Sequence, residues 1–447
     1  MPGIFMTTNP KTGHSGYIRV AAAAPRLRVG DPEYNTGEIL AWIKRADREG
    51  AALTVFPEMS IPGYTVADLY FQKLLQEKIE ENVLKLVDAS KDIRTVFLVG
   101  LPVRAEGSMF NVAAVIGQGK LYGFVPKTHI PNYKEFYEKR WFASARDLRA
   151  KEIMFGGKHV PIGTDLLFRV PAVRDFIFGV EICEDVWTPL PPSSFQVLRG
   201  ATLIANLSAS NELVGKAEYR RSLVIQQSAR GACGYVYASS GVHESTTDIV
   251  FGGHMMIAEN GALLSESKRF EREGEMILSD IDLEHIMSDR ERMTTFSASG
   301  DKNLEKDFRF IDVFSEPVNP STLLRSVAQF PFVPEDLSER DTRVQEIFSI
   351  QVAGLAKRLE FGEIQNLVLG LSGGLDSTLA FLVGLRAAEL LGLSRKNIYT
   401  YSMPGFGTSE RTQKNAKRLA ETLGVSFEVI DITKGVLQQF KDIGHDG

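Results

Sequence analysis

Two short segments of this chain of 447 residues carry side chains that could do chemistry. The first contains Cys183, which follows the strand-like run 176–182 and precedes Glu184 and Asp185; a cysteine thiolate is a strong nucleophile. The second is the sequence Gly-Leu-Ser-Gly-Gly-Leu-Asp-Ser at 370–377, between a strand-like run and a helical pattern. Backbone N–H groups at such a turn can bind phosphate. We therefore expect a chain that releases a group at the first site and captures it at the second with a nucleotide.

Glu58 and Lys127 are the side chains that we expect to act with Cys183. Glu58 follows the short apolar run 53–56 and Lys127 follows the run 121–126, so all three residues lie where a strand ends. A thiol that attacks a carboxamide needs a base for its proton and a positive charge beside the developing oxyanion. Taken singly, the three residues have ordinary structural interpretations, as a buried thiol, a capping carboxylate and a solvated cation. Together they favour catalysis, with Glu58 as base and Lys127 as cation.

Apolar periodicity indicates the elements that must position these residues. From about residue 18 to 283, short β-rich runs alternate with helical patterns, and Asn260-Gly261 predicts a hairpin turn within 252–264. This pattern is typical of an α/β domain with a buried sheet. Prolines break the periodicity from about 314 to 341, which indicates a linker or a segment that lies across a surface. A helix at 342–358 then precedes the pattern strand, glycine loop, helix, strand, helix, strand, which opens a doubly wound parallel sheet.

Composition limits the classes of function. The chain has 44% hydrophobic and 24% charged residues and a formal net charge of −5, which gives no basic surface for nucleic acid or an anionic membrane. Its two cysteines are too few for a disulfide scaffold. No stretch approaches the roughly 20 apolar residues of a membrane span, and the first residues lack the pattern of a signal peptide. We therefore expect a cytoplasmic protein whose partners are small molecules or copies of itself.

The cysteine site resembles a known family. Glu58 in Phe-Pro-Glu-Met-Ser-Ile-Pro-Gly-Tyr, Lys127 in Val-Pro-Lys and Cys183 in Glu-Ile-Cys-Glu-Asp-Val-Trp are similar to the Glu-Lys-Cys triad of the nitrilase, or carbon-nitrogen hydrolase, superfamily. The resemblance implies a four-layer αββα sandwich, which we expect over residues 1–315. It also implies that the three residues are catalytic.

The segments 127–142 and 206–211 resemble, more narrowly, the glutaminase domain of glutamine-dependent NAD synthetases. The resemblance assigns supporting roles to Glu135, beside the lysine, and to Glu184, beside the cysteine. It also implies a glutamine-binding set, namely Tyr64, Tyr133, Ser210 and Lys216. Family members can have arginine at the last of these positions, where lysine offers a point charge in place of a bidentate fork.

The glycine-rich loop resembles a different family. Ser-Gly-Gly-Leu-Asp-Ser at 372–377 matches the S-G-G-x-D-S loop of N-type ATP pyrophosphatases and lacks the Gly-Lys-Ser/Thr ending of a Walker loop. The resemblance implies that ATP binds here and that Asp376 helps to hold Mg²⁺; it implies no prosthetic group. Two glycines alone would be weak evidence, because glycine-rich turns are common in doubly wound folds. The residues expected at the ATP site are Gly370, Leu371, Ser372, Gly373, Gly374, Leu375, Asp376 and Ser377.

The two resemblances together predict a member of the glutamine-dependent NAD synthetases, with a linker at 316–341 and a synthetase domain at 342–447. Glutamine would yield glutamate and ammonia, and ammonia would amidate deamido-NAD that ATP has activated, giving NAD, AMP and pyrophosphate. Relatives assemble as homo-oligomers, and we expect the same here. The family continues beyond the point where this chain stops. We therefore expect a fragment, in preference to a truncated protein with glutaminase activity alone.

Two other interpretations remain open. One is a nitrilase-type amidase for another amide or nitrile, whose carboxyl-terminal segment serves only assembly; glutamine specificity and ATP binding would exclude it. The other is a non-catalytic ATP-sensing or scaffold subunit, for which an unreactive Cys183 would be the signature.

Overall fold

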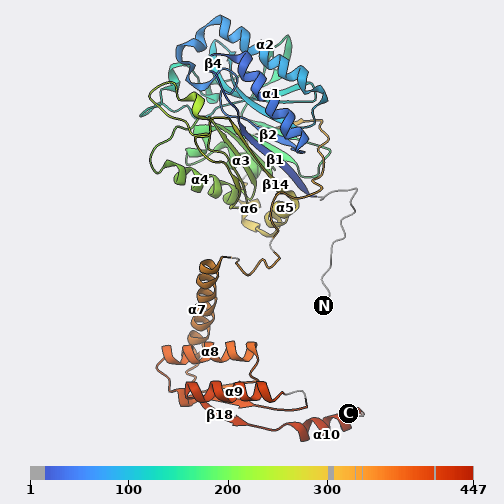
Figure 1. Ribbon diagram of the computed structural model, residues 1–447, viewed down its shortest axis with the longest axis vertical. Coiled ribbons are helices and arrows are strands. Elements are labelled where there is room, and N and C mark those ends of the chain that lie inside the picture. The colour runs from blue at the N-terminus through green and yellow to red at the C-terminus, as the bar shows by residue number, and fades with distance from the viewer. Residues whose placement is uncertain (1–15, 301–306, 328, 335, 407–408, 446–447) are drawn as a thin grey trace. The chain divides into compact units, whose positions relative to one another are not determined.

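The residues that this computed structural model describes are 16–300, 307–327, 329–334, 336–406 and 409–445. The chain forms two compact units that divide between Ser326 and Val327 (Figure 1). The division falls within the segment 316–341 that the sequence predicts as a linker.

The first unit contains two large β-sheets. In spatial order, the strands of the first sheet are β14 (Glu275–Asp282), β1 (Tyr17–Ala24), β2 (Leu53–Val55), β3 (Val96–Ala105), β4 (Ser108–Gly117) and β5 (Lys120–Pro126). Those of the second sheet are β13 (Ala262–Glu266), β12 (Met256–Glu259), β11 (Gly234–Ser239), β10 (Leu203–Ser208), β9 (Ile177–Ile182), β8 (Leu166–Arg169) and β15 (Arg309–Asp312). A separate hairpin consists of β6 (Glu152–Phe155) and β7 (Lys158–Pro161).

Helices cover the outer face of each large sheet (Figure 1). Helices α1 (Pro32–Arg48) and α2 (Lys73–Ala89) pack on the first sheet, and α3 (Pro192–Leu198) and α4 (Lys216–Arg230) pack on the second. The layers are therefore helix, sheet, sheet, helix, which confirms the predicted αββα sandwich. Helices α5 (Leu283–Arg292) and α6 (Thr294–Ala298) follow the last strand of the first sheet. Among the described helices, none has the length and apolar composition that crossing a membrane would require.

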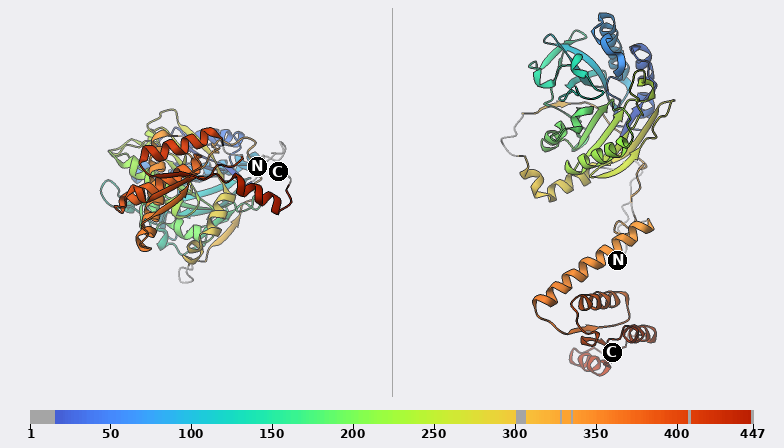
Figure 2. Two further views of the ribbon diagram at one scale, coloured as in Figure 1. Left: turned by 90° about the horizontal axis from the view of Figure 1, so that it is seen from below. Right: turned by 90° about the vertical axis from the view of Figure 1, so that its left-hand side faces the viewer.

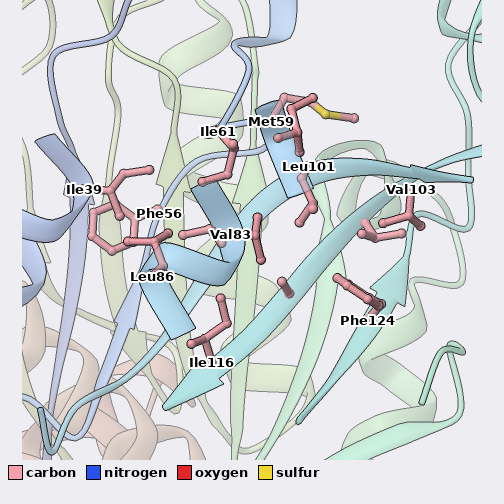
Figure 3. Close-up of a cluster of buried hydrophobic side chains, with 14 of the residues drawn as sticks. Ile39, Phe56, Met59, Ile61, Val83, Leu86, Leu101, Val103, Ile116 and Phe124 are labelled. Carbon is pink, nitrogen blue, oxygen red and sulfur yellow. The ribbon is translucent and has the colours of Figure 1, made fainter. Parts of the chain in front are cut away.

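Alternate side chains on the central strands pack into different layers of the sandwich, either against the helices or between the two sheets. Leu101 of β3 faces the helices, in one cluster with Ile39 of α1 and with Val83 and Leu86 of α2 (Figure 3). Leu98 of the same strand belongs to the cluster between the two sheets. Successive side chains of a strand point to opposite faces, so a strand that is buried on both faces is apolar throughout. This is why residues 96–101 show no polar alternation.

Parallel strands at the centre of both sheets bring their carboxyl ends together. Strand β2 is parallel to β1 and β3, and β10 is parallel to β9 and β11. Just past β2, the N–H of Glu58 donates to the carbonyl oxygen of Ser208, the last residue of β10, at 3.3 Å. The loops that follow these strands therefore meet at one edge of the sandwich.

A parallel sheet of three strands is the centre of the second unit. Its strands, in spatial order, are β16 (Leu367–Gly370), β17 (Ile398–Ser402) and β18 (Ser426–Val429). Helices α8 (Leu375–Leu390) and α9 (Glu410–Leu423) pack against it in one apolar cluster. Helix α7 (Leu337–Phe361), the long orange helix in the right-hand view of Figure 2, packs on α8, and α10 (Thr433–Asp442) follows β18. The order of elements is that of the predicted doubly wound sheet.

The described residues of the segment between the units form no helix or strand before Leu337, and part of the segment lies against the first unit. On the side of the first unit, the N–H of Leu324 donates to Asp280 Oδ2 on β14 at 2.6 Å. Helix α7 begins at Leu337, where the side chain of Asp336 caps it. It is longer at both ends than the predicted helix 342–358; at the amino-terminal end, the capping aspartate begins the helix before its apolar pattern starts.

Replacement of Phe178 by alanine is expected to destabilise the first unit. Phe178 lies on β9, fully buried between the sheets, and its ring stacks on that of Phe168 with 5.2 Å between centroids. Loss of a buried aromatic ring leaves a cavity, so the free energy of unfolding should fall by about 3–5 kcal/mol. Urea denaturation followed by tryptophan fluorescence measures this change, because all three tryptophans lie in the first unit. Leu74→Ala, at a residue of α2 that is 69% exposed, is the control and should change stability by less than about 0.5 kcal/mol. Equal losses in both variants would contradict this packing.

Candidate active site

Cys183 opens a tight turn at the end of β9. It begins the short helix η5 (Cys183–Trp187) directly after Ile182, with a φ of 47°. This left-handed conformation is costly for a residue with a side chain. The N–H of Cys183 donates to Asn206 Oδ1 at 3.3 Å, and the N–H of Ile182 donates to Asp185 Oδ2 at 3.0 Å. The backbone N–H groups of Ile182 and Cys183 are therefore both hydrogen-bonded. The cysteine itself is only 6% exposed.

Lys127 is a fully buried cation between two carboxylates. It is the first residue after β5, and its Nζ lies 2.7 Å from Glu58 Oε1 and 2.8 Å from each carboxylate oxygen of Glu138. A buried charge is costly unless it is paired and hydrogen-bonded. The two carboxylates meet that requirement and hold the ammonium group in one place.

Glu58 is held by donors from both sheets. Its Oε1 also accepts a hydrogen bond from Asn111 Nδ2 on β4 at 2.6 Å, and its Oε2 accepts one from the N–H of Ala209, just past β10, at 2.9 Å. Gly100 of β3 lets this segment lie against the sheet, because a Cβ there would be 2.1 Å from the backbone nitrogen of Met59. The Glu58 carboxylate is therefore fixed in position and orientation.

Burial determines the protonation states of these groups. Burial, and then the Glu58 carboxylate, raise the pKa of the Cys183 thiol well above its ordinary value, and Lys127 lowers it by less. Burial lowers the pKa of Lys127, but Glu138 and Glu58 together outweigh that effect and raise it. Burial raises the pKa of Glu138 to about 7 against the lowering effect of Lys127. At rest, the site therefore holds a neutral thiol beside a charged lysine.

The glutamate that contacts Lys127 is Glu138, not Glu135 as the sequence predicted. Glu135 Oε1 instead accepts a hydrogen bond from Asn211 Nδ2 at 2.8 Å. Both glutamates lie in the segment 127–142, and the spacing from the lysine does not choose between them. The available signal was the apolar Phe142, which is buried four residues after Glu138.

Three residues with predicted supporting or glutamine-binding roles, Tyr133, Glu184 and Lys216, lie near Cys183 and form what we call the rim, which carries both signs of charge. The hydroxyl of Tyr133 donates to Glu184 Oε1 at 2.7 Å, and Lys216 Nζ donates to Asn211 Oδ1 at 2.5 Å. Burial raises the pKa of Glu184 and lowers that of Lys216. Tyr133 and Lys216 lie close enough to Cys183 that an ionised thiol would raise the pKa of each.

Tyr64 and Ser210 lie deeper than the rim. The hydroxyl of Tyr64 donates to Glu138 Oε1 at 2.7 Å, so its partner is the carboxylate beside Lys127. Ser210 Oγ accepts a hydrogen bond from Arg220 Nη2 at 3.3 Å. Arg220 is fully buried and pairs with Glu212 at 2.9 Å. The sequence does not mark Arg220, because an arginine within a helical pattern is usually exposed.

A cavity of about 210 Å³ adjoins this group. Its lining includes Tyr64, Glu135 and Glu138 but not Cys183. The cavity therefore reaches the carboxylate side of the site.

The glycine loop of the second unit joins β16 to α8. Gly373 has a φ of 80°, and a Cβ there would lie 2.0 Å from the carbonyl oxygen of Thr412 on α9, so only glycine fits. Ser372 Oγ lies 3.0 Å from Ser377 Oγ and accepts a hydrogen bond from the N–H of Gly374 at 3.3 Å. The loop thus presents two hydroxyls at the amino terminus of α8, where the helix dipole favours an anion.

The other loop residues lie at its two ends. Gly370 ends β16, Leu371 is buried, and Leu375 begins α8. Asp376 is exposed in the first turn of α8. Across the residues that the structure describes, no group of three or more His, Cys, Asp or Glu side chains could hold a metal ion. A magnesium ion at Asp376 would therefore need oxygen ligands from another source, such as a bound phosphate chain.

Comparison with known proteins matches both units. Residues 19–291 match the family model described as carbon-nitrogen hydrolase, and residues 347–446 match the one described as NAD synthase. A glutamine-dependent NAD(+) synthetase of Mycobacterium tuberculosis is 42% identical over 433 residues, which are 96% of this chain and 64% of the relative. A protein of the same name from Thermotoga maritima is 28% identical over 427 residues, which are 93% of this chain and 65% of the relative. The chain thus spans just under two thirds of the length of these relatives.

A solved structure has the same fold. It is the crystal structure of a glutamine-dependent NAD(+) synthetase from Cytophaga hutchinsonii, with a TM-score of 0.53 and 23% sequence identity. The match covers 96% of this chain and 67% of the other.

Substitution of Glu244 tests the energetic cost of the buried carboxyl groups around the site. The Glu244 side chain accepts hydrogen bonds from the N–H groups of Tyr64 at 2.6 Å and Thr65 at 3.1 Å, and burial raises its pKa from 4.5 to about 7. Between these values the folded state binds more protons than the unfolded state, so this group reduces stability as the pH rises from 4.5 to 7. The free energy of unfolding of the parent should therefore fall by up to about 3 kcal/mol over this interval because of Glu244, and we expect Glu244→Gln to abolish that part of the fall.

Urea denaturation of the parent and the variant across this pH interval measures the effect as a difference in slope. Glu218→Gln on α4, where the side chain is 75% exposed, is the control and should leave the slope unchanged. Parallel pH curves for the parent and Glu244→Gln would show that the carboxyl group titrates normally in the folded state.

Proposed function

The chain belongs to the carbon-nitrogen hydrolase family, and from this membership and its NAD synthase segment we propose that it is a glutamine-dependent NAD(+) synthetase. The observation that carries the proposal is the meeting of Cys183, Lys127 and Glu58 in one buried group, each from the end of a different strand. The first unit hydrolyses glutamine to glutamate and ammonia. The second uses the ammonia and ATP to convert deamido-NAD to NAD, AMP and pyrophosphate.

Glu58 acts as the base because the thiol is neutral at rest. As Cys183 Sγ bonds to the amide carbon, its proton passes to Glu58 and the carbonyl oxygen becomes an oxyanion. Glu58 then returns the proton to the leaving nitrogen, the C–N bond breaks, and ammonia leaves a thioester. Water attacks the thioester, again with Glu58 taking the proton, and releases glutamate and the thiol.

Lys127 stabilises the oxyanion. Its ammonium group is already fixed by Glu58 and Glu138, so it needs no reorganisation as negative charge develops on the substrate. The hydroxyl of Tyr64 donates to the same Glu138 carboxylate and so helps to hold the cation in place.

The rim suits a free amino acid better than a neutral amide or nitrile. Glutamine carries an α-carboxylate and an α-ammonium group, and the rim offers a cation, Lys216, and an anion, Glu184. Tyr133 adds a hydroxyl group at the rim, and Ser210 adds one below it. Charge complementarity of this kind selects for a zwitterion, which favours glutamine over the substrates of a general amidase.

ATP binds at the loop of residues 370–377, where backbone N–H groups and the hydroxyls of Ser372 and Ser377 receive its phosphates. Asp376 would hold Mg²⁺, and the ion would offset the phosphate charge. We further propose that the protein is cytoplasmic, in keeping with two cysteines that are both free thiols. We also propose that it forms a homo-oligomer, as the resemblance to its family implies.

Cys183→Ala is expected to abolish ammonia release from glutamine, by about 10⁴-fold or more, because the nucleophile is removed. Ammonia and glutamate are measured with and without ATP and deamido-NAD, and NAD is followed in the same samples. Cys233→Ala is the matched control, since Cys233 is the other buried thiol and lies in the core cluster beneath α4. It should keep glutaminase activity. Absence of glutamine hydrolysis by the parent chain would contradict the proposal.

Gly373→Ala is expected to weaken ATP binding at least tenfold, because its Cβ would meet the Thr412 carbonyl and displace the loop. Isothermal titration with Mg-ATP measures the affinity. Gly392→Ala is the control, because Gly392 also has a positive φ, of 69°, but has open space around the Cβ position. The only effect expected for Gly392→Ala is backbone strain, which should lower the free energy of unfolding by about 1–2 kcal/mol. Equal ATP affinity in all three proteins would argue against the loop as the nucleotide site.

A further inference from the structure

A chain of buried polar groups runs through the second sheet to the backbone of Cys183. On β9, Glu181 accepts hydrogen bonds from the hydroxyl of Tyr235 through Oε1 and from the N–H of Ser193 through Oε2, the latter at 2.9 Å. The oxygen of the Tyr235 hydroxyl accepts a hydrogen bond from Asn206 Nδ2 on β10 at 3.1 Å. Asn206 Oδ1 then accepts the N–H of Cys183 at 3.3 Å. All of these residues are buried.

While Glu181 is ionised, donor and acceptor chemistry allows this chain of hydrogen bonds one direction only. The backbone N–H groups of Cys183 and Ser193 can only donate, and an ionised carboxylate can only accept. Because the Tyr235 hydroxyl donates its hydrogen bond to Glu181, the Tyr235 oxygen can only accept one from Asn206 Nδ2. The amide of Asn206 must therefore turn its oxygen toward Cys183. A reversed amide would place an NH₂ group against the N–H of the cysteine.

We propose that Glu181 and Tyr235 are positioning residues for the nucleophile, because they orient the Asn206 amide that holds Cys183 in its left-handed backbone conformation. Neither residue touches the substrate. The inference rests on the proposed function and deepens it by adding the groups that keep the thiol in line with Glu58 and Lys127.

The burial of Glu181 calls for such a role. Its hydrogen-bond partners, Tyr235 and Ser193, are both neutral, and burial raises its pKa to about 7. A buried carboxylate without a cation destabilises a fold. Two apolar side chains of the same volume in place of Glu181 and Tyr235 would lower the stability less. The strained φ of 47° at Cys183 adds a further cost that its hydrogen bond to Asn206 offsets.

Asn206 also connects the nucleophile to the base. Its Oδ1 accepts the hydroxyl of Ser208 at 2.7 Å, and the next residue, Ala209, donates its N–H to Glu58 Oε2 at 2.9 Å. The same end of β10 therefore positions both the backbone of Cys183 and the carboxylate that takes its proton. A change in the Asn206 amide would move these two groups relative to each other.

Two variants of the full chain test the proposal. Tyr235→Phe removes the hydroxyl from the chain of hydrogen bonds. Glu181→Gln keeps the shape but cannot accept from both Tyr235 and Ser193, since a glutamine side chain has one oxygen and one NH₂ group. For each variant we would measure kcat and KM for glutamine, the rate at which iodoacetamide alkylates Cys183 as read by peptide mass spectrometry, and the melting temperature.

We expect kcat to fall at least about tenfold in both variants, because a small displacement of a reacting group is costly. The KM for glutamine should stay within about twofold, since the rim is unchanged, and alkylation of Cys183 should slow in parallel with kcat. Glu181→Gln should melt close to the parent, because the loss of a buried charge offsets the buried donor that glutamine leaves unpaired; this separates positioning from a purely structural role. Tyr122→Phe is the control: its hydroxyl accepts the N–H of Phe314 at 3.2 Å, away from this chain of groups. Its kcat should stay within about twofold of the parent.

Parent-like kcat and parent-like or faster alkylation in both variants would overturn the proposal. If Tyr235→Phe does not fold, Glu181→Gln decides, because it removes no volume. Failure of the parent to hydrolyse glutamine would count against the proposed function instead, and the alkylation rates would still test the positioning of Cys183.

Discussion

The buried ammonium group of Lys127 is the constraint on which the first unit depends. An unpaired buried cation would cost several kcal/mol, so the fold must bring carboxylates to it. Glu58 comes from the end of β2 and Glu138 from the segment after β5, and Glu58 itself needs donors from β4 and from the end of β10. One charge thus joins the first sheet to the second. The two sheets can satisfy it only when they stack face to face with these strand ends together.

Both units place their candidate sites at the carboxyl end of a parallel strand, in a turn with positive φ, but they use different residue types there. At the end of β9 the residue is Cys183, with φ 47°, and at the end of β16 it is Gly373, with φ 80°. A side chain performs the chemistry proposed for the first site, so the strain must be carried by a residue with a Cβ. Backbone N–H groups perform the binding proposed for the second, so a glycine that approaches α9 closely serves best.

The sequence predicts features that local patterns determine. Glu58, Lys127 and Cys183 each follow a short apolar run, which was enough to place them at strand ends, and Asn260-Gly261 predicted the β12–β13 hairpin, although β12 begins only at Met256. Contacts between distant segments could not be predicted. The choice of Glu138 over Glu135 and the burial of Arg220 depend on which charged groups meet in the folded chain, and single-sequence patterns treat every charged residue as exposed.

In the proposed mechanism, the neutral thiol determines what limits catalysis. Cys183 shares its surroundings with two carboxyl groups and one lysine, so a resting thiolate would add negative charge to a buried site with little to offset it. As proposed, the thiol becomes nucleophilic only when a carbonyl carbon accepts its electron pair while Glu58 accepts its proton. Oxidants act chiefly on thiolates, so the same burial protects the cysteine between turnovers. The thiol is not deprotonated before the substrate binds. Its reactivity must therefore come from the distance and angle between its sulfur and the Glu58 carboxylate. The proposed mechanism therefore makes the rate depend on the backbone geometry that Asn206, Tyr235 and Glu181 maintain behind the thiol.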